Sequence, residues 1–324
     1  MKPTRRTFLK LSATGLAAPA ILMPASGFAT PAKRGNQITG VNRMQVGSFE
    51  VTALLDGALI INPKLITGYD EDIATNTLSL QHLPAAPEGQ VVPVTGYLVN
   101  TGDKLIAIDC GTTDSFVDTL GNYHTSLASA GVSVEQIDHV ITTHLHVDHI
   151  GGLTDGKGNA MFPNADLITN QVEWDFWHND TLRAQSNDIV KSFFDIARTQ
   201  TAPYNDRITI AQQNTEITPG VELVSLPGHT PGHIGVHLRS NGDELLIWGD
   251  IIHATKLQFE NPDWTLAFDI DQDMARTTRT RLLDQIATDG IKVAGMHLDF
   301  PGFGHVTRSG KQYRFEQTAW DYNL

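Results

Sequence analysis

A cluster of metal-binding side-chain types at the end of a predicted strand most constrains how this chain can fold. Residues 137–143 form an apolar, β-branched segment typical of a buried strand, and the run His144-Leu145-His146-Val147-Asp148-His149 follows it directly. Three imidazoles and a carboxylate within six residues would crowd a loop and repel protons unless a cation organised them. The alternative is a solvated, histidine-rich turn. The run therefore predicts a metal-binding loop where a strand ends.

Three further candidate ligands occupy similar positions later in the chain. His229 lies in the segment Pro227-Gly228-His229-Thr230-Pro231-Gly232, Asp250 follows Trp248-Gly249, and His297 follows the apolar residues 291–296. Any one of these histidines alone would more often be an ordinary hydrogen-bonded residue. Because strand ends on one edge of stacked sheets converge in space, we expect these side chains to meet the first run.

The remaining pattern interleaves strands and helices in two similar halves. Predicted strands cover residues 45–61, 96–100, 105–109, 137–143, 165–169, 221–225, 233–238, 244–248 and 291–296. Predicted helices cover residues 115–130, ended by Gly131, and 274–288, ended by Gly290, and residues 304–318 resemble a hairpin that turns at Ser309-Gly310. This order predicts an α/β fold of stacked sheets with helices outside, an αββα sandwich.

The spacing of these ligands resembles the metal-binding pattern of the metallo-β-lactamase superfamily across essentially the whole chain after residue 29. The resemblance implies one metal held by His144, His146 and His229, a second held by Asp148, His149 and His297, Asp250 bridging both, and Asp109 close behind the ligands. Oxygen and nitrogen donors without thiolate suit two zinc ions, although manganese, cobalt or iron fit as well.

Two metals that share a water would supply a bridging hydroxide without any serine or cysteine nucleophile, so hydrolysis is the expected reaction. Asp250 is expected to orient that hydroxide and to move its proton. The sequence has no Gly-x-Ser-x-Gly motif that would favour a serine mechanism.

Two segments bear on the substrate. Residues 248–253 and 297–306 resemble the methyl parathion hydrolase-like and lactonase-like exported dinuclear hydrolases, whose members act on organophosphate triesters, aryl esters or lactones and are usually dimeric. Acyl-homoserine lactonases commonly carry a tyrosine three residues after the bridging aspartate, where this chain has His253. His253 is either a proton donor to the leaving group or a polar residue of the cleft.

An apolar substrate needs apolar walls. By the same resemblance, the aromatic residues expected to line the pocket are Phe116, Trp174, Phe193 and Phe268.

The first 29 residues have the form of a twin-arginine export signal. Arg5 and Arg6 precede an uncharged, Ala- and Leu-rich stretch that Pro19 and Pro24 interrupt, which is short for a membrane span. Residues 30–324 are predicted to form one hydrolase domain, passed through the twin-arginine translocase to the periplasm or the exterior without stable membrane insertion. Losing the four basic residues of the leader changes the formal charge from −13 to −17, which disfavours a nucleic-acid partner.

Two other functions remain open from the sequence. The first is a redox member of the superfamily that uses iron, such as a persulfide dioxygenase-like protein. The second is a non-catalytic binding protein that keeps the fold. The single cysteine, Cys110, follows a predicted buried strand and is expected to be packing, so the chain cannot form an internal disulfide.

Overall fold

The computed structural model describes residues 37–84, 86–113 and 116–322, and residues 39–324 form one compact unit. The predicted export signal, residues 1–29, and the predicted start of the domain at residue 30 lie outside the described residues.

The first sheet contains seven strands in the order β1-β2-β4-β5-β6-β7-β8. Its strands are β1 (Val41–Val46), β2 (Phe49–Ile61), β4 (Gln90–Asn100), β5 (Leu105–Ile108), β6 (His139–Ile141), β7 (Asp166–Asn170) and β8 (Ile208–Ala211). The long β2 and β4 pair antiparallel, with a register shift at Gly57, and β5 to β8 run parallel. Because parallel strands have their carboxyl ends on one edge, the loops after β5 and β6 lie side by side.

The second sheet also contains seven strands, in the order β16-β15-β14-β12-β11-β10-β9. Its strands are β9 (Glu216–Thr218), β10 (Val221–Ser225), β11 (Ile234–Ser240), β12 (Asp243–Ile247), β14 (Lys292–Ala294), β15 (Phe303–Ser309) and β16 (Gln312–Gln317). β12 and β14 are parallel neighbours, so the loops after these two strands also share an edge. A two-stranded sheet joins β3 (Ile66–Thr67) and β13 (Thr265–Leu266).

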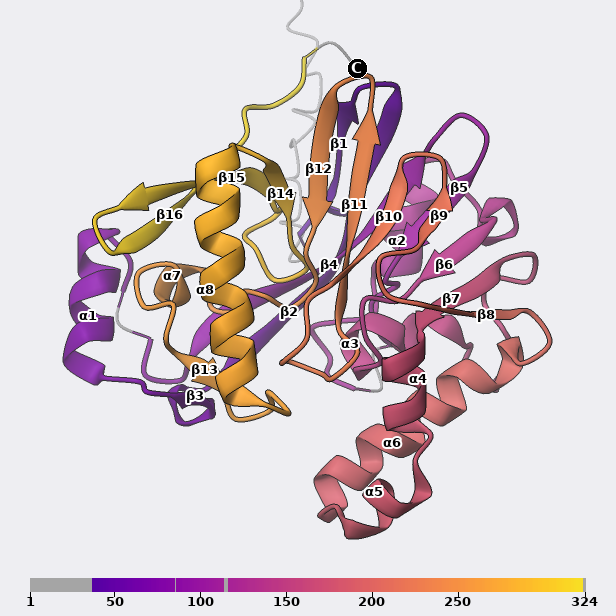
Figure 1. Ribbon diagram of the computed structural model, residues 1–324, viewed down its shortest axis with the longest axis horizontal. Helices are drawn as coiled ribbons and strands as arrows, with labels where there is room; N and C mark the ends of the chain where they lie inside the picture. The colour runs from indigo at the N-terminus through magenta and orange to yellow at the C-terminus, as the bar shows by residue number, and fades with distance from the viewer. Residues whose placement is uncertain (1–36, 85, 114–115, 323–324) are drawn as a thin grey trace, which may run out of the picture. The chain divides into compact units, whose positions relative to one another are not determined.

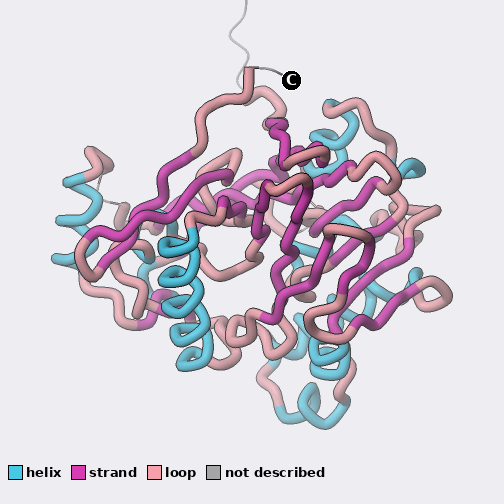
Figure 2. Tube along the Cα trace, turned by 45° about the horizontal axis from the view of Figure 1, so that its top comes forward, coloured by secondary structure: helices cyan, strands magenta, loops and turns pink. Residues whose placement is uncertain are grey.

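Helices cover the outer faces of the two large sheets. They are α1 (Glu71–Leu80), α2 (Tyr123–Ser129), α3 (Val147–Ile150), α4 (Gln171–Trp177), α5 (Asp180–Gln185), α6 (Asp188–Thr201), α7 (Thr255–Gln258) and α8 (Gln272–Asp289). In Figure 1, α8 crosses in front of the second sheet, and α5 and α6 project at the bottom. Figure 2 shows the strands grouped centrally with helices around them. The predicted αββα sandwich is confirmed.

Three apolar layers hold this arrangement together. The central layer packs inward-facing residues of both sheets, including Val51, Ile108, Leu223 and Ile247. A second layer joins the first sheet to α2, α4 and α6, and a third joins the second sheet to α8. Burial of apolar surface on both faces explains why the central strands read as nearly continuous apolar runs.

The predicted helix over residues 115–130 is wrong in its first half. The helix begins only at Tyr123, because the buried carboxylate of Asp56 accepts hydrogen bonds from the backbone nitrogens of Thr112, Gly121 and Tyr123. Gly121 has a φ of 95°, which a helix does not allow. A partner more than fifty residues away in sequence thus fixes this segment as a turn, and local periodicity carries no sign of it.

Candidate metal centre

The candidate ligands come from loops that leave the carboxyl ends of strands in both sheets. The run from His144 to His149 follows β6 and forms the start of α3, and His229 lies between β10 and β11. Asp250 follows β12 and His297 follows β14. The convergence expected from the sequence is therefore what the topology produces.

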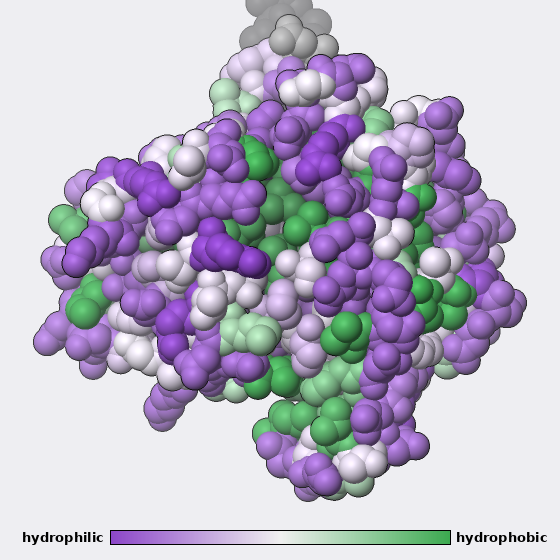
Figure 3. Space-filling model, viewed as in Figure 1, coloured by the Kyte–Doolittle hydropathy of each residue, from purple (hydrophilic) through white to green (hydrophobic). Residues whose placement is uncertain are grey.

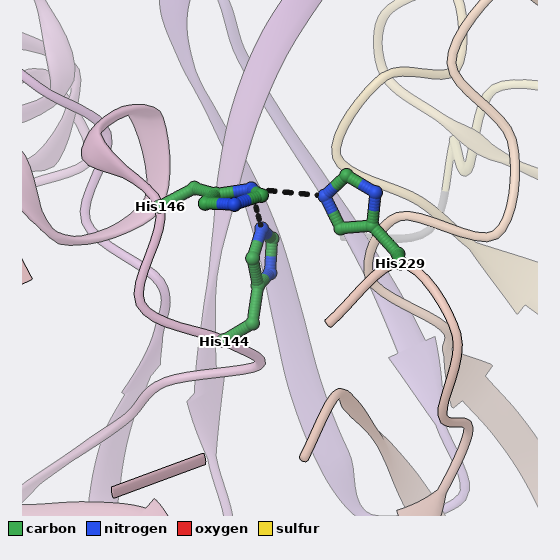
Figure 4. A group of neighbouring side chains, drawn as sticks. All are labelled: His144, His146 and His229. Carbon is green, nitrogen blue, oxygen red and sulfur yellow. Dashed lines mark hydrogen bonds between the residues drawn. The ribbon is translucent and has the colours of Figure 1, made fainter. Parts of the chain in front are cut away.

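One group of side chains brings together three imidazoles, drawn in Figure 4. The Nδ1 atom of His146 lies 3.0 Å from the Nε2 atom of His144 and 3.0 Å from the Nε2 atom of His229. All three rings are buried. The nitrogens point toward a common centre.

A second group joins Asp148, His149 and His297. The Oδ2 atom of Asp148 lies 3.5 Å from the Nε2 atoms of both His149 and His297.

The carboxylate of Asp250 lies between the two groups. Its Oδ2 atom is 3.0 to 3.5 Å from the Nε2 atom of five histidines, which are His144, His149, His229, His253 and His297. The resemblance implies that Asp250 bridges two metals, and in the structure its carboxylate lies near histidines of both groups.

The donor set fits divalent cations. A tetrahedral cation with bonds of 2.0–2.1 Å separates its ligand atoms by about 3.3 Å, close to the spacings within each group. Within the described part of the chain, the buried atoms His149 Nε2 and Asp250 Oδ1 have no hydrogen-bond partner, as expected of atoms that face a cation. The seven side chains named as ligands from the sequence thus lie together in two groups that share Asp250.

Hydrogen bonds from behind orient the ligand rings. The Nδ1 atom of His149 donates to Asp109 (2.7 Å), that of His229 to Asp269 (2.7 Å), and that of His297 to the carbonyl oxygen of Pro93 (2.8 Å). These bonds leave each Nε2 atom free to coordinate a cation. Asp109 also accepts from the backbone nitrogen and the hydroxyl of Thr143, so the position expected for Asp109 agrees with the structure.

Asp269 and His233 are among the residues that support the ligands and that sequence reasoning missed. Asp269 gave no signal, because it lies in an irregular segment forty residues from its partner His229. His233 was taken only as a strand start, yet its Nε2 atom accepts a hydrogen bond from the backbone nitrogen of Asp250 and its Nδ1 atom donates to the carbonyl oxygen of Leu226. Burial lowers the pKa of His233 to about 3, so the ring is neutral and can accept.

The ligand histidines fall into two kinds, those whose pKa is lowered and those whose pKa is raised. Burial holds the pKa of His144 and of His146 well below the usual range. Burial also opposes protonation of His149 and His229, but neighbouring carboxylates overcome it, raising the pKa of His149 well above its usual value and that of His229 to about 9. Without cations, the site therefore keeps protons on some of its ligands.

A cavity of about 310 Å³ opens over the ligands. Its floor is formed by His146, Asp148, Asp250, His253 and His297. The other lining residues are apolar, and they are Leu59, Ile60, Ile61, Leu65, Val92, Phe116, Val117, Val147, Phe193 and Phe268. The end of β2 thus supplies wall residues that the sequence pattern had assigned only to a strand.

Three of the four predicted pocket aromatics, Phe116, Phe193 and Phe268, line this cavity, and Trp174 does not. Trp174 stacks on His178 with ring centroids 3.6 Å apart, one turn along α4. Figure 3 shows a green, apolar surface at the bottom of the view, where α5 and α6 lie. The exposed large apolar residues of these two helices are Leu182 and Ile189.

The family model described as the metallo-beta-lactamase superfamily matches residues 89–297, and the chain belongs to this superfamily. An N-acyl homoserine lactonase of a Bacillus species is 25% identical over 209 residues, which cover 59% of this chain and 76% of that protein. Anti-Pycsar protein Apyc1 of Paenibacillus sp. (strain J14) is 30% identical over 168 residues, 49% of this chain and 61% of that protein.

Two solved structures share the fold over most of the chain. The hydrolase AbOPH of the beta lactamase superfamily superposes with a TM-score of 0.83 and 29% identity, covering 88% of this chain and all of that one. AidC, a dizinc quorum-quenching lactonase, superposes with a TM-score of 0.80 and 24% identity over the same shares. Family membership, the lactonase relatives and the ligand groups identify the chain as a metal-dependent hydrolase. No helix in the described residues is long and apolar enough to cross a membrane.

Proposed function

We propose that this chain is a dinuclear hydrolase of small, neutral, apolar esters, with aryl carboxylic esters and aryl dialkyl phosphates as the preferred substrates. The observation that carries this proposal is the lining of the cavity, which combines an apolar wall with a floor of imidazoles and carboxylates and, among the residues that the structure describes, contains no lysine or arginine.

The apolar lining favours neutral substrates. Apart from the two cations that the site would hold, a phosphate monoester or diester would find no cationic side chain among the described lining residues to pair with its remaining charge. A neutral ester has no such charge, and its aryl or alkyl groups gain free energy by leaving water for the surfaces of Phe193, Phe268 and Leu59.

The residues present would hold two divalent cations, which we propose to be zinc. His144, His146 and His229 would bind one, Asp148, His149 and His297 the other, and Asp250 both. When bound, such cations lower the pKa of water and polarise the oxygen under attack.

The side chains of the site divide the remaining tasks. The carboxylate of Asp250 would orient the attacking water and accept its proton. The aromatic wall orients the substrate over the floor and excludes water from it.

A second candidate substrate is a lactone. The N-acyl homoserine lactonase relatives favour it, since their similarity spans 209 residues. The presence of His253, and not tyrosine, beside Asp250 favours esters with good leaving groups, because such groups need little acid assistance.

The test compares kcat/KM for an aryl acetate, an aryl dialkyl phosphate, an acyl-homoserine lactone and the matching aryl phosphate diester on the zinc-loaded protein, with and without chelator. We expect the neutral aryl esters to exceed the anionic diester by at least about 100-fold, about 2.7 kcal/mol of transition-state discrimination. Lactone turnover above that of both aryl esters would make the lactone the substrate. Equal rates for the neutral and anionic aryl phosphates would contradict the charge argument.

We also propose export through the twin-arginine pathway and assembly as a homodimer, both of which rest on the sequence. Retention of an Arg5→Lys/Arg6→Lys precursor in the cytoplasm tests export. Sedimentation of the mature protein tests the dimer.

A further inference from the structure

One buried carboxylate, outside all the candidate ligand groups, joins the two loops that carry the first group of histidines. Glu173 lies in the first turn of α4, and its side chain is fully buried. The side chain of Asn170 caps this helix by accepting a hydrogen bond from the backbone nitrogen of Val172, so Glu173 is held at a fixed end of β7 and α4.

All four hydrogen bonds to this carboxylate come from the loops or from its own helix. The Oε1 atom accepts from the backbone nitrogen of Leu145 (3.0 Å) and from Nε1 of Trp177 (2.7 Å). The Oε2 atom accepts from the hydroxyl of Thr230 (2.7 Å) and from the backbone nitrogen of Gly232 (3.0 Å). Two backbone nitrogens and an indole nitrogen can only donate, so the ionised carboxylate, which accepts at both oxygens, is the form that satisfies all four donors as they are oriented here.

The bonded atoms lie next to the ligands. Leu145 stands between His144 and His146 in the loop of the first sheet, and Thr230 directly follows His229 in the loop of the second sheet. Glu173 therefore joins the two loops and fixes the distance between them. These loops carry the three imidazoles that Figure 4 draws.

Two packing contacts place α4 against the same group. A Cβ atom added to Gly232 would lie 2.0 Å from the backbone nitrogen of Glu173, so the His229 loop rests directly on the helix. The ring of Trp177, one turn along, meets that of His146 edge-on at 5.5 Å. The helix end thus supports the first group and makes none of these contacts with Asp148, His149 or His297.

From this arrangement we infer that Glu173 is a positioning residue for one of the two cations, the one held by His144, His146 and His229. This inference rests on the proposed two-cation site, and it predicts a loss of affinity confined to that cation when Glu173 is altered.

The conservative variant Glu173→Gln isolates the effect. The glutamine amide retains one oxygen, which can still accept the hydrogen bonds from the backbone nitrogen of Leu145 and from Nε1 of Trp177. Its NH₂ group then faces Thr230 and Gly232. The hydroxyl of Thr230 can turn and accept, but the backbone N–H of Gly232 then faces another donor and loses its partner. The loop of His229 is the part released.

The experiment titrates zinc into the metal-free, full-length mature protein against a chromophoric chelator and resolves the two binding steps. We expect Glu173→Gln to weaken one step by about 10- to 100-fold and to leave the other unchanged. The variant Asp109→Asn, which replaces the charged partner of His149 by a neutral amide, should weaken the other step, and the double variant should weaken both.

Asp56→Asn is the matched control, because Asp56 is also a buried carboxylate that accepts backbone hydrogen bonds but contacts no ligand. We expect it to lower the melting temperature and to leave both zinc affinities as in the wild type. If Glu173→Gln does not fold, Thr230→Val removes one of the four bonds and should weaken the same step several-fold.

The inference is overturned if Glu173→Gln lowers only the melting temperature, or if it weakens the same step as Asp109→Asn. A wild-type protein that binds one zinc ion would instead refute the proposed two-cation site. In that case, Glu173 is still a positioning residue if Glu173→Gln weakens the single zinc-binding step more than Asp56→Asn does. It is not one if the two variants weaken that step equally.

Discussion

The Nε2 atom of His253 lies 3.0 Å from the Oδ2 atom of Asp250, and Asp250 also faces the Nε2 atoms of the ligand histidines. The ring of His253 stacks on that of His297, with centroids 4.9 Å apart and an interplanar angle of 19°. Within the described part of the chain, its buried Nδ1 atom has no hydrogen-bond partner. His253 is thus held by one nitrogen at the floor of the cavity.

This position predicts a role for His253 that depends on the leaving group. Burial lowers the pKa of His253 to about 4, so the ring is neutral near pH 7 and donates a proton poorly there. We therefore expect His253→Ala to lower kcat for esters of alkyl alcohols by only about 10-fold, through loss of an N–H donor to the departing alkoxide. Turnover of 4-nitrophenyl esters should change far less. A plot of rate against leaving-group pKa for both proteins measures the difference in slope. An equal loss of kcat for the alkyl and the 4-nitrophenyl esters would indicate that His253 acts in metal binding and not as a proton donor.

Removing the cations should abolish hydrolysis, and the ligand histidines should then take up protons. Because neighbouring carboxylates raise the pKa of His149 and bring that of His229 to about 9, against the effect of burial, both rings carry protons near pH 7 in the metal-free protein. A cation must displace these protons, so metal affinity should rise with pH up to about 9.

Competition titrations with zinc at two pH values, and calorimetry in buffers of different ionisation enthalpy, measure this proton release. Affinities that do not change with pH would contradict the charge assignment of the two rings.

Truncating two adjacent phenylalanines should affect two different properties, the KM in one case and the stability of the fold in the other. Phe193 lines the cavity and meets the ring of His146 at 5.7 Å, whereas Phe194 is buried against Trp177 and Phe176. Phe193→Ala removes substrate contacts worth about 1.5–3 kcal/mol and should raise KM for aryl esters by about 10- to 100-fold. Phe194→Ala should destabilise the fold by about 3–5 kcal/mol.

Steady-state kinetics and urea unfolding on both variants separate the two effects. A loss of stability in Phe193→Ala as large as that in Phe194→Ala would make Phe193 a core residue.

The ligands could be predicted from the sequence because they lie in segments that follow the ends of β6, β10, β12 and β14, so a local pattern marks their positions. The segment of α8, the hairpin of β15 and β16, and the turn at Ser309-Gly310 were likewise local and are confirmed. Gly290 adopts the left-handed conformation that ends α8.

The residues that support the ligands could not be predicted in this way. Glu173, Asp269 and His233 act through partners 17 to 59 residues distant in sequence. From the sequence alone, an acidic residue on a short helix such as Glu173 is expected to face solvent, because the segments that cover it are remote in the chain. The family resemblance also misplaced Trp174, which was expected in the pocket, whereas its ring stacks on His178.

The stability of the fold should fall in mild acid in part through His124. Its Nε2 atom bonds to the carbonyl oxygen of Gly152 (2.9 Å), and its ring lies against Phe162. Burial lowers the pKa of His124 below its usual value of 6.5, and the hydrogen bond to Gly152 opposes this only in part. As the pH falls through 6.5, the unfolded chain takes up a proton that the folded ring resists, so stability is lost.

The variant His124→Gln tests this, since its amide can still donate to Gly152 but does not titrate. We expect its free energy of unfolding to fall less steeply than that of the wild type between about pH 7 and pH 5. Because release of cations is common to both proteins, the difference between the two urea-unfolding curves isolates His124. Parallel pH profiles would show that another group takes up the proton.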